Sequence, residues 1–309
     1  MKKLIHLVSH KIIYYLIRAI LKCLSFLPLT IINYCAIKLG LLLINKSNKA
    51  KLRVQNNLLK TKLANIDNLE YMTNQVAIET GKTLLEALLI AWSKNKYYNY
   101  KLIANFYNLD LVEPAVKQDT AILFLTPHIG NFEIALKATA HMFNKQFNIL
   151  YKPNTTLFLE DLMYHGRSEN NIKPLPTNTS GISSIVRAIK NKELIGILPD
   201  SVASQGEGVW VNFFENKIFA PILVAKLILS YKIPVFIVAS KRNNNKNNSA
   251  INFDLEYIPF NITSTNAQEL MQEIYNILEA IIKKNPTQYY WSYDRFRIPK
   301  SNQYLKPLQ

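Results

Sequence analysis

The periodicity of apolar and polar residues changes along the chain, and this change divides the chain into two parts. Residues 51–92 place apolar side chains, among them Val76, Leu84 and Leu88, at the three- and four-residue intervals of an α-helix. From about residue 120, short apolar runs alternate with amphipathic stretches. This pattern predicts strands at 121–126, 148–151, 194–198, 234–239 and 251–258, and helices at 132–143, 155–164, 181–190, 220–230 and 267–284.

Strands that alternate with helices favour an α/β fold with a mostly parallel central sheet flanked by helices, because a parallel pair of strands needs a crossover connection. With 309 residues and 49% hydrophobic content, the chain is long and apolar enough to bury a full core. We predict a hydrophobic helical anchor over residues 1–45 and a globular domain over residues 46–309. That domain has a helical lead-in (46–118) and an α/β core (119–309), in which residues 243–248 form a solvated asparagine-rich loop.

The predicted anchor is the most apolar long region of the chain, from Leu4 to Ile44. Its longest uncharged stretch, from Cys23 to Ile37, is shorter than the roughly 20 residues that a spanning helix needs, and Pro28 interrupts it. The segment therefore either spans a membrane or lies shallowly on one, and the sequence leaves both open. If it spans, the basic block from Lys46 to Lys62 is expected on the cytoplasmic side.

The formal net charge of +16 raises nucleic acid as a partner, so its distribution matters. No acidic residue precedes Asp67, whereas twelve lysines and arginines do. Because these charges are mixed with aliphatic and aromatic residues, they indicate an anionic membrane surface more than a nucleic-acid groove. A nucleic-acid-binding or basic membrane-scaffold protein remains an alternative of a different class, which predicts steeply salt-dependent binding.

Cysteine and histidine usage gives no sign of a metal site or a disulfide framework. Cys23 and Cys35 both lie in the apolar N-terminal segment, where they are expected to serve packing. His6 and His10 have helical spacing but no third ligand nearby. We therefore expect no metal and no cofactor.

The segment Thr126-Pro127-His128-Ile129-Gly130-Asn131-Phe132-Glu133 carries the strongest chemical signal. It places His128 just past a buried strand, where open α/β sheets hold their ligands. Asn131 is a good N-cap, so Glu133 falls in the first turn of the next helix, and Gly130 permits the intervening reversal.

In this arrangement His128 is predicted to act as a general base. A carboxylate from Glu133 that accepts a hydrogen bond from one ring nitrogen leaves the other nitrogen free to take a proton from a hydroxyl. The plainer interpretation is an ordinary loop histidine, with Glu133 complementing the helix dipole. A seryl nucleophile is not expected, because no G-x-S-x-G elbow is present.

The spacing of His128 and Glu133 resembles the H-x4-D/E motif of the lysophospholipid and glycerolipid acyltransferase superfamily. The chain is more specifically similar to the lipid A biosynthesis (lauroyl and myristoyl) acyltransferases. The similarity continues in order through Leu150–Asn154, Gly166–Arg167, residues 181–190 with 196–200, Val209–Phe214, and residues 286–291 with Arg295–Phe296. Two departures are Lys152, where the family often has arginine, and Glu215-Asn216, in place of the usual glycine.

The resemblance implies an enzyme that moves an acyl chain from an acyl carrier protein thioester to a hydroxyl of a lipid A precursor. It also implies a site at the bacterial inner membrane, with the catalytic domain on the cytoplasmic face and His128 and Glu133 as the catalytic pair. The expected partners are acyl carrier protein, the lipid precursor and the anionic membrane, without nucleic acid. A related acyltransferase that acts on a glycerolipid or another glycolipid is the nearer alternative.

Four residues are predicted to contact the substrates. Arg167 is the first candidate for a phosphate or sugar of the acceptor, since a guanidinium suits bidentate phosphate recognition, and Lys152 is the second. Asn131 stands beside the reactive histidine. Asp200 follows the strand predicted at 194–198, where it either positions the acceptor or caps the next turn.

Aromatic and basic residues near the C-terminus have more than one interpretation. Trp210, Phe213 and Phe214 are expected to line an acyl tunnel or to belong to the core. Arg295 and Arg297 are expected to meet phosphates or the acidic carrier protein, or to form a basic edge that faces the membrane.

Overall fold

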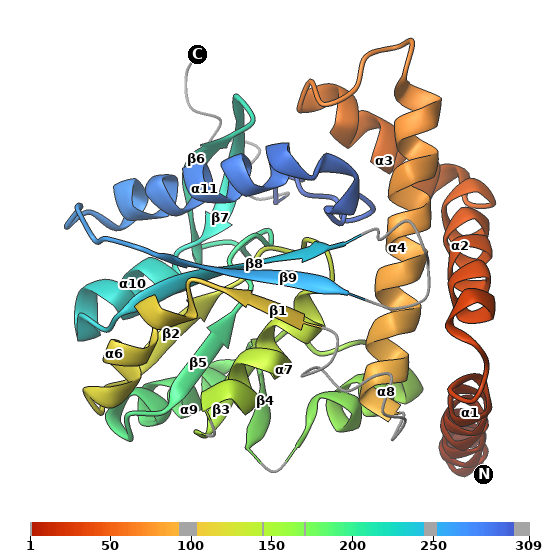
Figure 1. Ribbon diagram of the computed structural model, residues 1–309, viewed down its shortest axis with the longest axis horizontal. Helices are drawn as coiled ribbons and strands as arrows, with labels where there is room; N and C mark the ends of the chain where they lie inside the picture. Colours follow the sequence, from red (N-terminus) through yellow and green to blue (C-terminus); the bar gives the residue numbers. More distant parts are fainter. Residues whose placement is uncertain (1, 93–103, 144, 170, 244–251, 300–309) are drawn as a thin grey trace.

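The computed structural model describes residues 2–92, 104–143, 145–169, 171–243 and 252–299. The N-terminal helices stand beside an α/β unit, and the long helix α4 runs between α2 and that unit (Figure 1). The N-terminal helices are α1 (Lys2–Leu24), α2 (Leu29–Asn45), α3 (Asn48–Lys60) and α4 (Leu69–Trp92).

The helical stretch predicted over 51–92 is broken into α3 and α4 by a polar turn. In this turn the Asn65 backbone N–H donates to Asn68 Oδ1 (2.9 Å) and the Asn68 N–H donates to Asn65 Oδ1 (3.0 Å). Asparagine side chains that bond the nearby backbone compete with the helix ladder, which explains the interruption.

A seven-stranded sheet with the order β1-β9-β8-β2-β5-β3-β4 forms the centre of the α/β unit. Its pairs are parallel except β8 with β9, so the predicted α/β class with a mostly parallel sheet is confirmed. The strands are β1 (Ala104–Tyr107), β2 (Ile122–Leu125), β3 (Phe147–Tyr151), β4 (Ile172–Pro176), β5 (Leu194–Ile197), β8 (Val235–Arg242) and β9 (Phe253–Pro259).

Two strands of this sheet and a separate hairpin have no counterpart in the sequence prediction. β1 and β4 lie at the two edges, where prolines such as Pro174 are tolerated in a strand although they weaken its sequence signal. The hairpin pairs β6 (Gly208–Phe213) with β7 (Asn216–Pro221). Of the predicted loop 243–248, only Asn243 lies within the described residues.

Helices cover both faces of the sheet. They are α6 (Glu113–Lys117), α7 (Phe132–Phe143), α8 (Leu157–Arg167), α9 (Thr179–Lys190), α10 (Leu223–Tyr231) and α11 (Ala267–Lys284), with the 3-10 turns η2 (Leu109–Leu111) and η3 (Pro286–Gln288). Along β2, Ile122 and Phe124 belong to the core cluster that includes α7, whereas Leu123 and Leu125 belong to the cluster that includes α9, α10 and α11. The alternation follows from the two-residue period of a strand.

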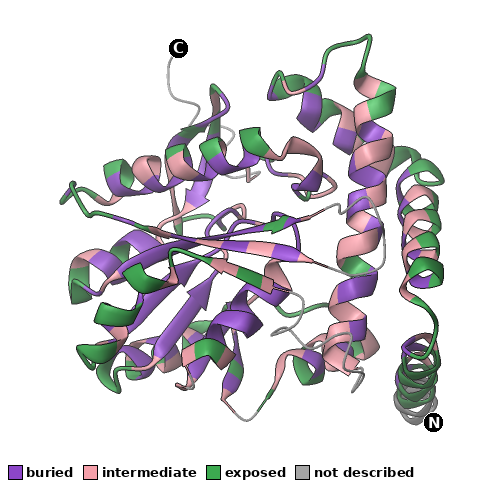
Figure 2. Cartoon of the chain, viewed as in Figure 1, coloured by how far each residue is buried: buried purple, intermediate pink, exposed green. Residues whose placement is uncertain are grey.

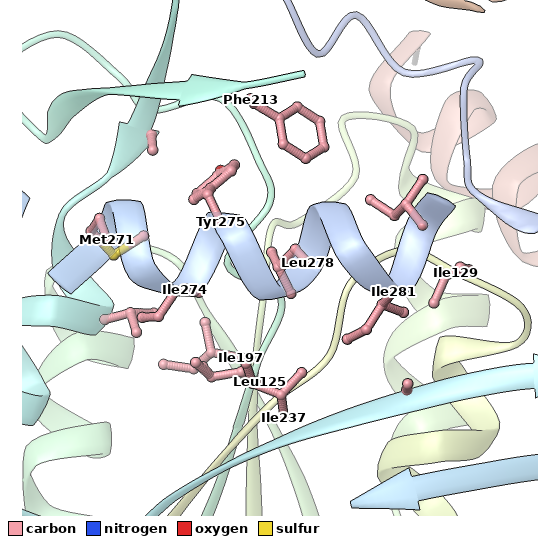
Figure 3. Packing of buried hydrophobic residues seen from close by; sticks show 14 of the residues in the cluster. Leu125, Ile129, Ile197, Phe213, Ile237, Met271, Ile274, Tyr275, Leu278 and Ile281 are labelled. Carbon is pink, nitrogen blue, oxygen red and sulfur yellow. The ribbon is translucent and has the colours of Figure 1, made fainter. Parts of the chain in front are cut away.

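Burial is greatest in the central strands and in the helix faces turned toward them (Figure 2). On α11, Ile274, Leu278 and Ile281 lie on the side of the helix that faces the strands, near Leu125 and Ile237 (Figure 3). Both faces of the central strands are therefore buried. Polar residues that follow β2 and β5 lie together beyond the carboxyl ends of these strands.

The outer surfaces of α1 and α2 are exposed although they are apolar (Figure 2). Within the described residues no single helix has the length and hydropathy of a membrane span. Only α2 and α3 taken together meet both criteria, and the two are bent by 91° relative to each other. The exposed apolar residues include Ile12, Ile13, Tyr15, Leu16, Ile20, Phe26, Leu27, Ile31, Tyr34, Leu42 and Leu43.

Candidate active site

His128 lies in the loop between β2 and α7 and is paired with Asp200, which follows β5. Its Nδ1 atom is 2.7 Å from Asp200 Oδ1, and its backbone N–H donates to Asp200 Oδ2 at 3.0 Å. The register of the sheet brings the two together, because Leu125 of β2 is paired with Ile197 of β5. His128 and Asp200 each stand three residues beyond these partners, so they meet at the carboxyl edge of the parallel strands.

This pairing sets the state of the imidazole. When Nδ1 of the neutral ring donates to a carboxylate, Nε2 carries no proton and is able to accept one. The His128 side chain is 24% exposed, whereas Asp200 is fully buried beneath it. The pair therefore has the arrangement of a general base with its orienting carboxylate.

Two further groups hold the Asp200 carboxylate. Tyr289 donates its hydroxyl to Asp200 Oδ2 at 2.8 Å, and Arg295 Nη2 lies 3.4 Å from the same oxygen. Burial by itself raises the pKa of Asp200, but the charge of Arg295, the charge of His128 when its ring is protonated, and the hydrogen bonds from His128 outweigh it, so the pKa lies well below its usual range. Asp200 is therefore ionised at neutral pH.

The expected hydrogen bond between His128 and Glu133 is replaced by a different pairing. Arg167, at the end of α8, binds the Glu133 carboxylate through Nε, which is 3.0 Å from Oε2 and 3.1 Å from Oε1, and through Nη2. A guanidinium matches a carboxylate geometrically, which explains why Glu133 turns to Arg167 rather than to the ring of His128. The partner of His128 Nδ1 is Asp200, and the prediction of Glu133 in that position is wrong.

Glu133 still contributes charge near the imidazole. Burial by itself raises the pKa of Glu133, but Arg167 and, more weakly, Lys137 and His128 lower it. The net shift is downward, so the carboxylate remains ionised. Arg167 has little exposed surface and also lies over the Tyr151 ring, with 5.3 Å between Cζ and the ring centroid.

The two other predicted site residues, Asn131 and Lys152, differ in burial. Asn131 is fully buried; its Oδ1 accepts from the Ile134 N–H (3.3 Å) and its Nδ2 donates to Glu86 (3.3 Å). An amide with both ends engaged inside the protein is arranged to cap α7 rather than to meet a substrate. Lys152 is exposed in the loop after β3.

The C-terminal segment supplies Tyr289 and Arg295, which the sequence did not place beside Asp200. Residues 128–129 and 289–290 lie side by side, since Ile129 bridges Tyr289 and the Tyr290 N–H donates to the His128 carbonyl at 2.9 Å. Arg295 is only 1% exposed, so the expectation of a basic edge at this position is wrong, while Arg297 is exposed. In the sequence, the signal for Tyr289 and Arg295 was the block of family similarity over residues 286–291 with Arg295–Phe296.

Phe213 and Phe214 are core residues. Both are buried, Phe213 packs edge-on against Tyr275 and Phe214 against Trp291. Across the part of the chain that the structure describes, no group of three His, Cys, Asp or Glu side chains is placed to hold a metal ion.

The family model described as "Bacterial lipid A biosynthesis acyltransferase" matches residues 1–298 of the chain. No curated protein matches it. The matched range includes the N-terminal helices, the central sheet and every residue of the site around His128.

Proposed function

Because this chain belongs to the bacterial lipid A biosynthesis acyltransferase family, we propose that it transfers a fatty acyl chain from an acyl carrier protein thioester to a hydroxyl of a lipid A precursor. The observation that carries the proposal is the His128–Asp200 pair beyond the carboxyl ends of the central strands β2 and β5, with 2.7 Å between Nδ1 and Oδ1. Membership of an enzyme family also removes the nucleic-acid-binding or scaffold alternative as the principal function.

The reaction is a direct transfer. His128 Nε2 takes the proton of the acceptor hydroxyl as the oxygen attacks the thioester carbonyl carbon. The tetrahedral intermediate then collapses, the carbon–sulfur bond breaks, and the departing thiolate receives the proton from Nε2. An ester and a free carrier thiol result, without a covalent acyl-enzyme.

Asp200 and Glu133 support this step in different ways. Asp200 orients the ring and stabilises the imidazolium that forms, because it is buried, ionised and bonded to Nδ1. Glu133 adds negative charge nearby and holds Arg167. Arg167 retains N–H donors beyond those that bind Glu133, so it and the exposed Lys152 are the proposed contacts for phosphate on the acceptor.

The surface of the N-terminal helices supports a membrane location. Exposed apolar residues on α1 and α2 stand among basic residues such as Lys11, Arg18 and Lys22 and suit the interface of an anionic bilayer. We place the enzyme at the bacterial inner membrane with the sheet on the cytoplasmic side, where acyl carrier protein is available.

The test is transfer by membranes that contain the protein. Lauroyl acyl carrier protein and a lipid A precursor are supplied together, and products are measured by mass spectrometry. The expected result is one added acyl mass, lost in His128→Ala and kept in His165→Ala, which changes an exposed histidine on α8. Transfer to lysophosphatidic acid instead would favour a glycerolipid acceptor, and no transfer to either lipid would overturn the proposal.

A further inference from the structure

The loop that carries His128 is held by α4 and η3 as well as by its own strand. The Gly130 N–H donates to the Gln288 carbonyl at 3.0 Å, and Thr83 Oγ1 of α4 donates to the Gly130 carbonyl at 2.8 Å. Gly130 has a φ of +56°, and a Cβ there would lie 2.2 Å from the Ser240 carbonyl oxygen. Backbone conformation and hydrogen bonds thus place the residue two positions after His128 in a narrow gap.

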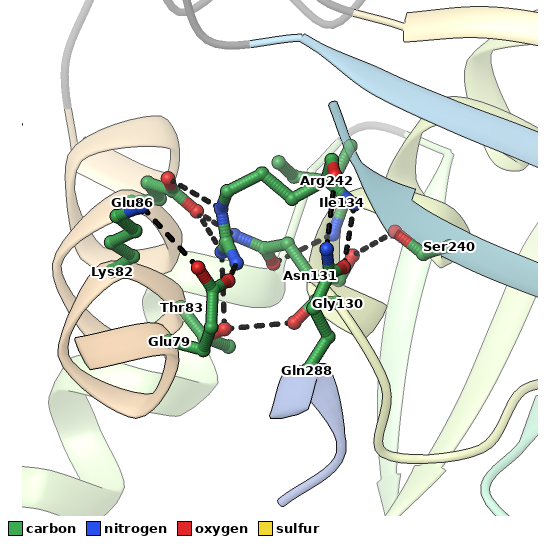
Figure 4. A network of polar contacts seen from close by, with 10 residues as sticks. All are labelled: Glu79, Lys82, Thr83, Glu86, Gly130, Asn131, Ile134, Ser240, Arg242 and Gln288. Atoms are coloured by element: carbon green, nitrogen blue, oxygen red, sulfur yellow. Dashed lines mark hydrogen bonds and ion pairs between the residues drawn. The ribbon is translucent and has the colours of Figure 1, made fainter. Parts of the chain in front are cut away.

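Arg242, at the end of β8, lies at the centre of these contacts (Figure 4). Its Nε donates to Glu86 Oε1 (3.1 Å) and its Nη2 to Glu86 Oε2 (2.6 Å), while Nη1 is bonded to Glu79. Nη2 also donates to Thr83 Oγ1 at 3.1 Å. The same hydroxyl therefore receives a hydrogen bond from Arg242 and gives one to the catalytic loop.

A second path reaches the loop through the Asn131 side chain. Glu86 Oε2 accepts from both Arg242 Nη2 and Asn131 Nδ2, so one carboxylate joins the guanidinium to the N-cap of α7. In addition, Gln288 exchanges two hydrogen bonds with the Arg242 backbone, at 2.7 and 3.0 Å. Arg242 is consequently linked to both residues that follow Ile129.

The side chains of the network are almost completely shielded from solvent, and their formal charges nearly cancel. Arg242 is 5% exposed, Glu79 and Glu86 are 6% exposed, and Lys82 lies at the rim, 3.3 Å from Glu79. Removing two carboxylates and a guanidinium from water is costly, and replacing buried ion pairs by apolar residues of similar volume is often neutral or stabilising. The network is therefore weak evidence for a gain in stability, whereas its hydrogen bonds fix the position of the loop.

The helix that supplies these carboxylates is itself fixed on its other side. Gly40 of α2 and Gly81 of α4 allow the two backbones to touch, because a Cβ at Gly81 would lie 2.1 Å from the Ala36 carbonyl oxygen. α4 therefore connects the helices with exposed apolar surfaces to the loop that holds the base (Figure 1).

We infer that Thr83, Glu86 and Arg242 are positioning residues for acyl transfer, which hold the His128 loop at the geometry that the reaction requires. The inference rests on the proposed role of His128 as the base. It concerns residues that touch neither His128 nor the reacting atoms. They act through the position of the loop, and the kinetic constant that they are expected to change is kcat.

The sharpest variant is Thr83→Val, which keeps the shape of the side chain and removes the hydroxyl that joins Arg242 to Gly130. We expect kcat to fall by about 10- to 100-fold, because small displacements of a catalytic group carry penalties of this order, with the KM for the acyl donor unchanged. Thr83→Ser keeps the hydroxyl and should keep kcat. Wild-type kcat in Thr83→Val would overturn the inference.

Two controls separate positioning from folding and from the proposed function. Tyr257→Phe removes a buried hydrogen bond of 2.9 Å to Thr139 of α7, far along the helix from the loop, and should lower the thermal midpoint without changing kcat. If Tyr257→Phe lowers kcat as much as Thr83→Val does, the effect is general destabilisation and the inference fails. If wild-type protein is inactive or His128→Ala remains active, the proposed function fails instead.

A double-mutant cycle tests whether the residues act as one unit. Glu86→Gln removes the charge that joins Arg242 to Asn131, and combined with Thr83→Val it should lower kcat by less than the product of the two single effects. Thr83→Val combined with Tyr257→Phe should be multiplicative. Multiplicative behaviour in both pairs would contradict a shared network.

Discussion

Arg295 Nη2 lies 3.4 Å from Asp200 Oδ2, and both side chains are almost entirely inside the protein. The guanidinium also lies over the rings of Tyr289 and Tyr293, with centroid distances of 5.2 and 4.7 Å. A positive charge in this position holds Asp200 ionised beneath His128. The C-terminal segment thereby takes part in the electrostatics of a site formed mainly by β2 and β5.

Replacing Arg295 with glutamine should shift the acid limb of the pH–activity profile to higher pH. Burial raises the pKa of Asp200 and Arg295 is the largest influence that lowers it, so removing the guanidinium raises that pKa. The carboxylate is then protonated earlier as pH falls, and His128 loses its partner. The measurement is kcat against pH for Arg295→Gln, with Arg297→Gln as the exposed control. Superimposable acid limbs would contradict this role.

Asp200→Asn should lower kcat by about 10⁴-fold, the size of effect found when an amide replaces the carboxylate that orients a catalytic histidine. The amide is able to donate to Nδ1, which favours the wrong tautomer. Steady-state kinetics with the acyl carrier protein donor measures this effect. The thermal midpoint should be measured in parallel, because the change also leaves Arg295 buried without its counter-charge.

Glu133 and Arg167 should behave as one unit. Glu133→Gln and Arg167→Lys each break the bidentate pair, so each is expected to lower kcat/KM, and the double variant should be little worse than the more damaging single variant. A coupling free energy of about 0.5–3 kcal/mol from the cycle is expected for residues in contact. Additive effects would show that the two side chains act separately.

Glu169 is predicted to stabilise the protein in a pH-dependent way. Its carboxylate accepts from Lys137 Nζ at 2.6 Å and is bonded to His141. Burial raises its pKa, but His141 and Lys137 lower it to about 2. A carboxylate with a lowered pKa contributes stability that is present above its unfolded-state pKa, about 4.3, and is lost as pH falls toward the folded-state value.

The variant Glu169→Gln isolates this contribution. Its free energy of unfolding should be lower than that of the wild type at about pH 6. The difference should shrink as the pH falls toward the folded-state pKa of Glu169, about 2. Urea unfolding at a series of pH values provides the measurement. A difference that is constant with pH would mean that the pair contributes packing rather than charge.

The exposed apolar surface of α1 should bind anionic vesicles. Leu16 and Ile20 are 58% and 49% exposed, and changing both to glutamate adds negative charge and removes apolar area. Co-sedimentation with anionic vesicles should fall strongly in this double variant. Ile66→Glu is the matched control, since Ile66 is 86% exposed but lies in the turn between α3 and α4. Equal loss in the control would argue against a membrane face on α1.

Much of the fold was predictable because its signals are local. The apolar run 121–126 and the amphipathic run 132–143 differ in period, and they correspond to β2 and α7. The edge strand β4 was missed because Pro174 and Pro176 oppose a strand except at an edge, and only the complete sheet defines its edges. The motif around His128 identified the candidate base for the same local reason.

The partners of that base were a matter of tertiary structure. The sequence alone determined the family resemblance, the alternation of strands and helices, and a histidine at the end of a buried strand. Which carboxylate reaches its ring depended on the register of β2 with β5, which joins residues 72 positions apart, and on Arg167 capturing Glu133 from α8. Arg295 is likewise buried because the C-terminal segment packs against the His128 loop. The spacing of residues in the sequence does not contain such long-range contacts, so it could not predict this burial.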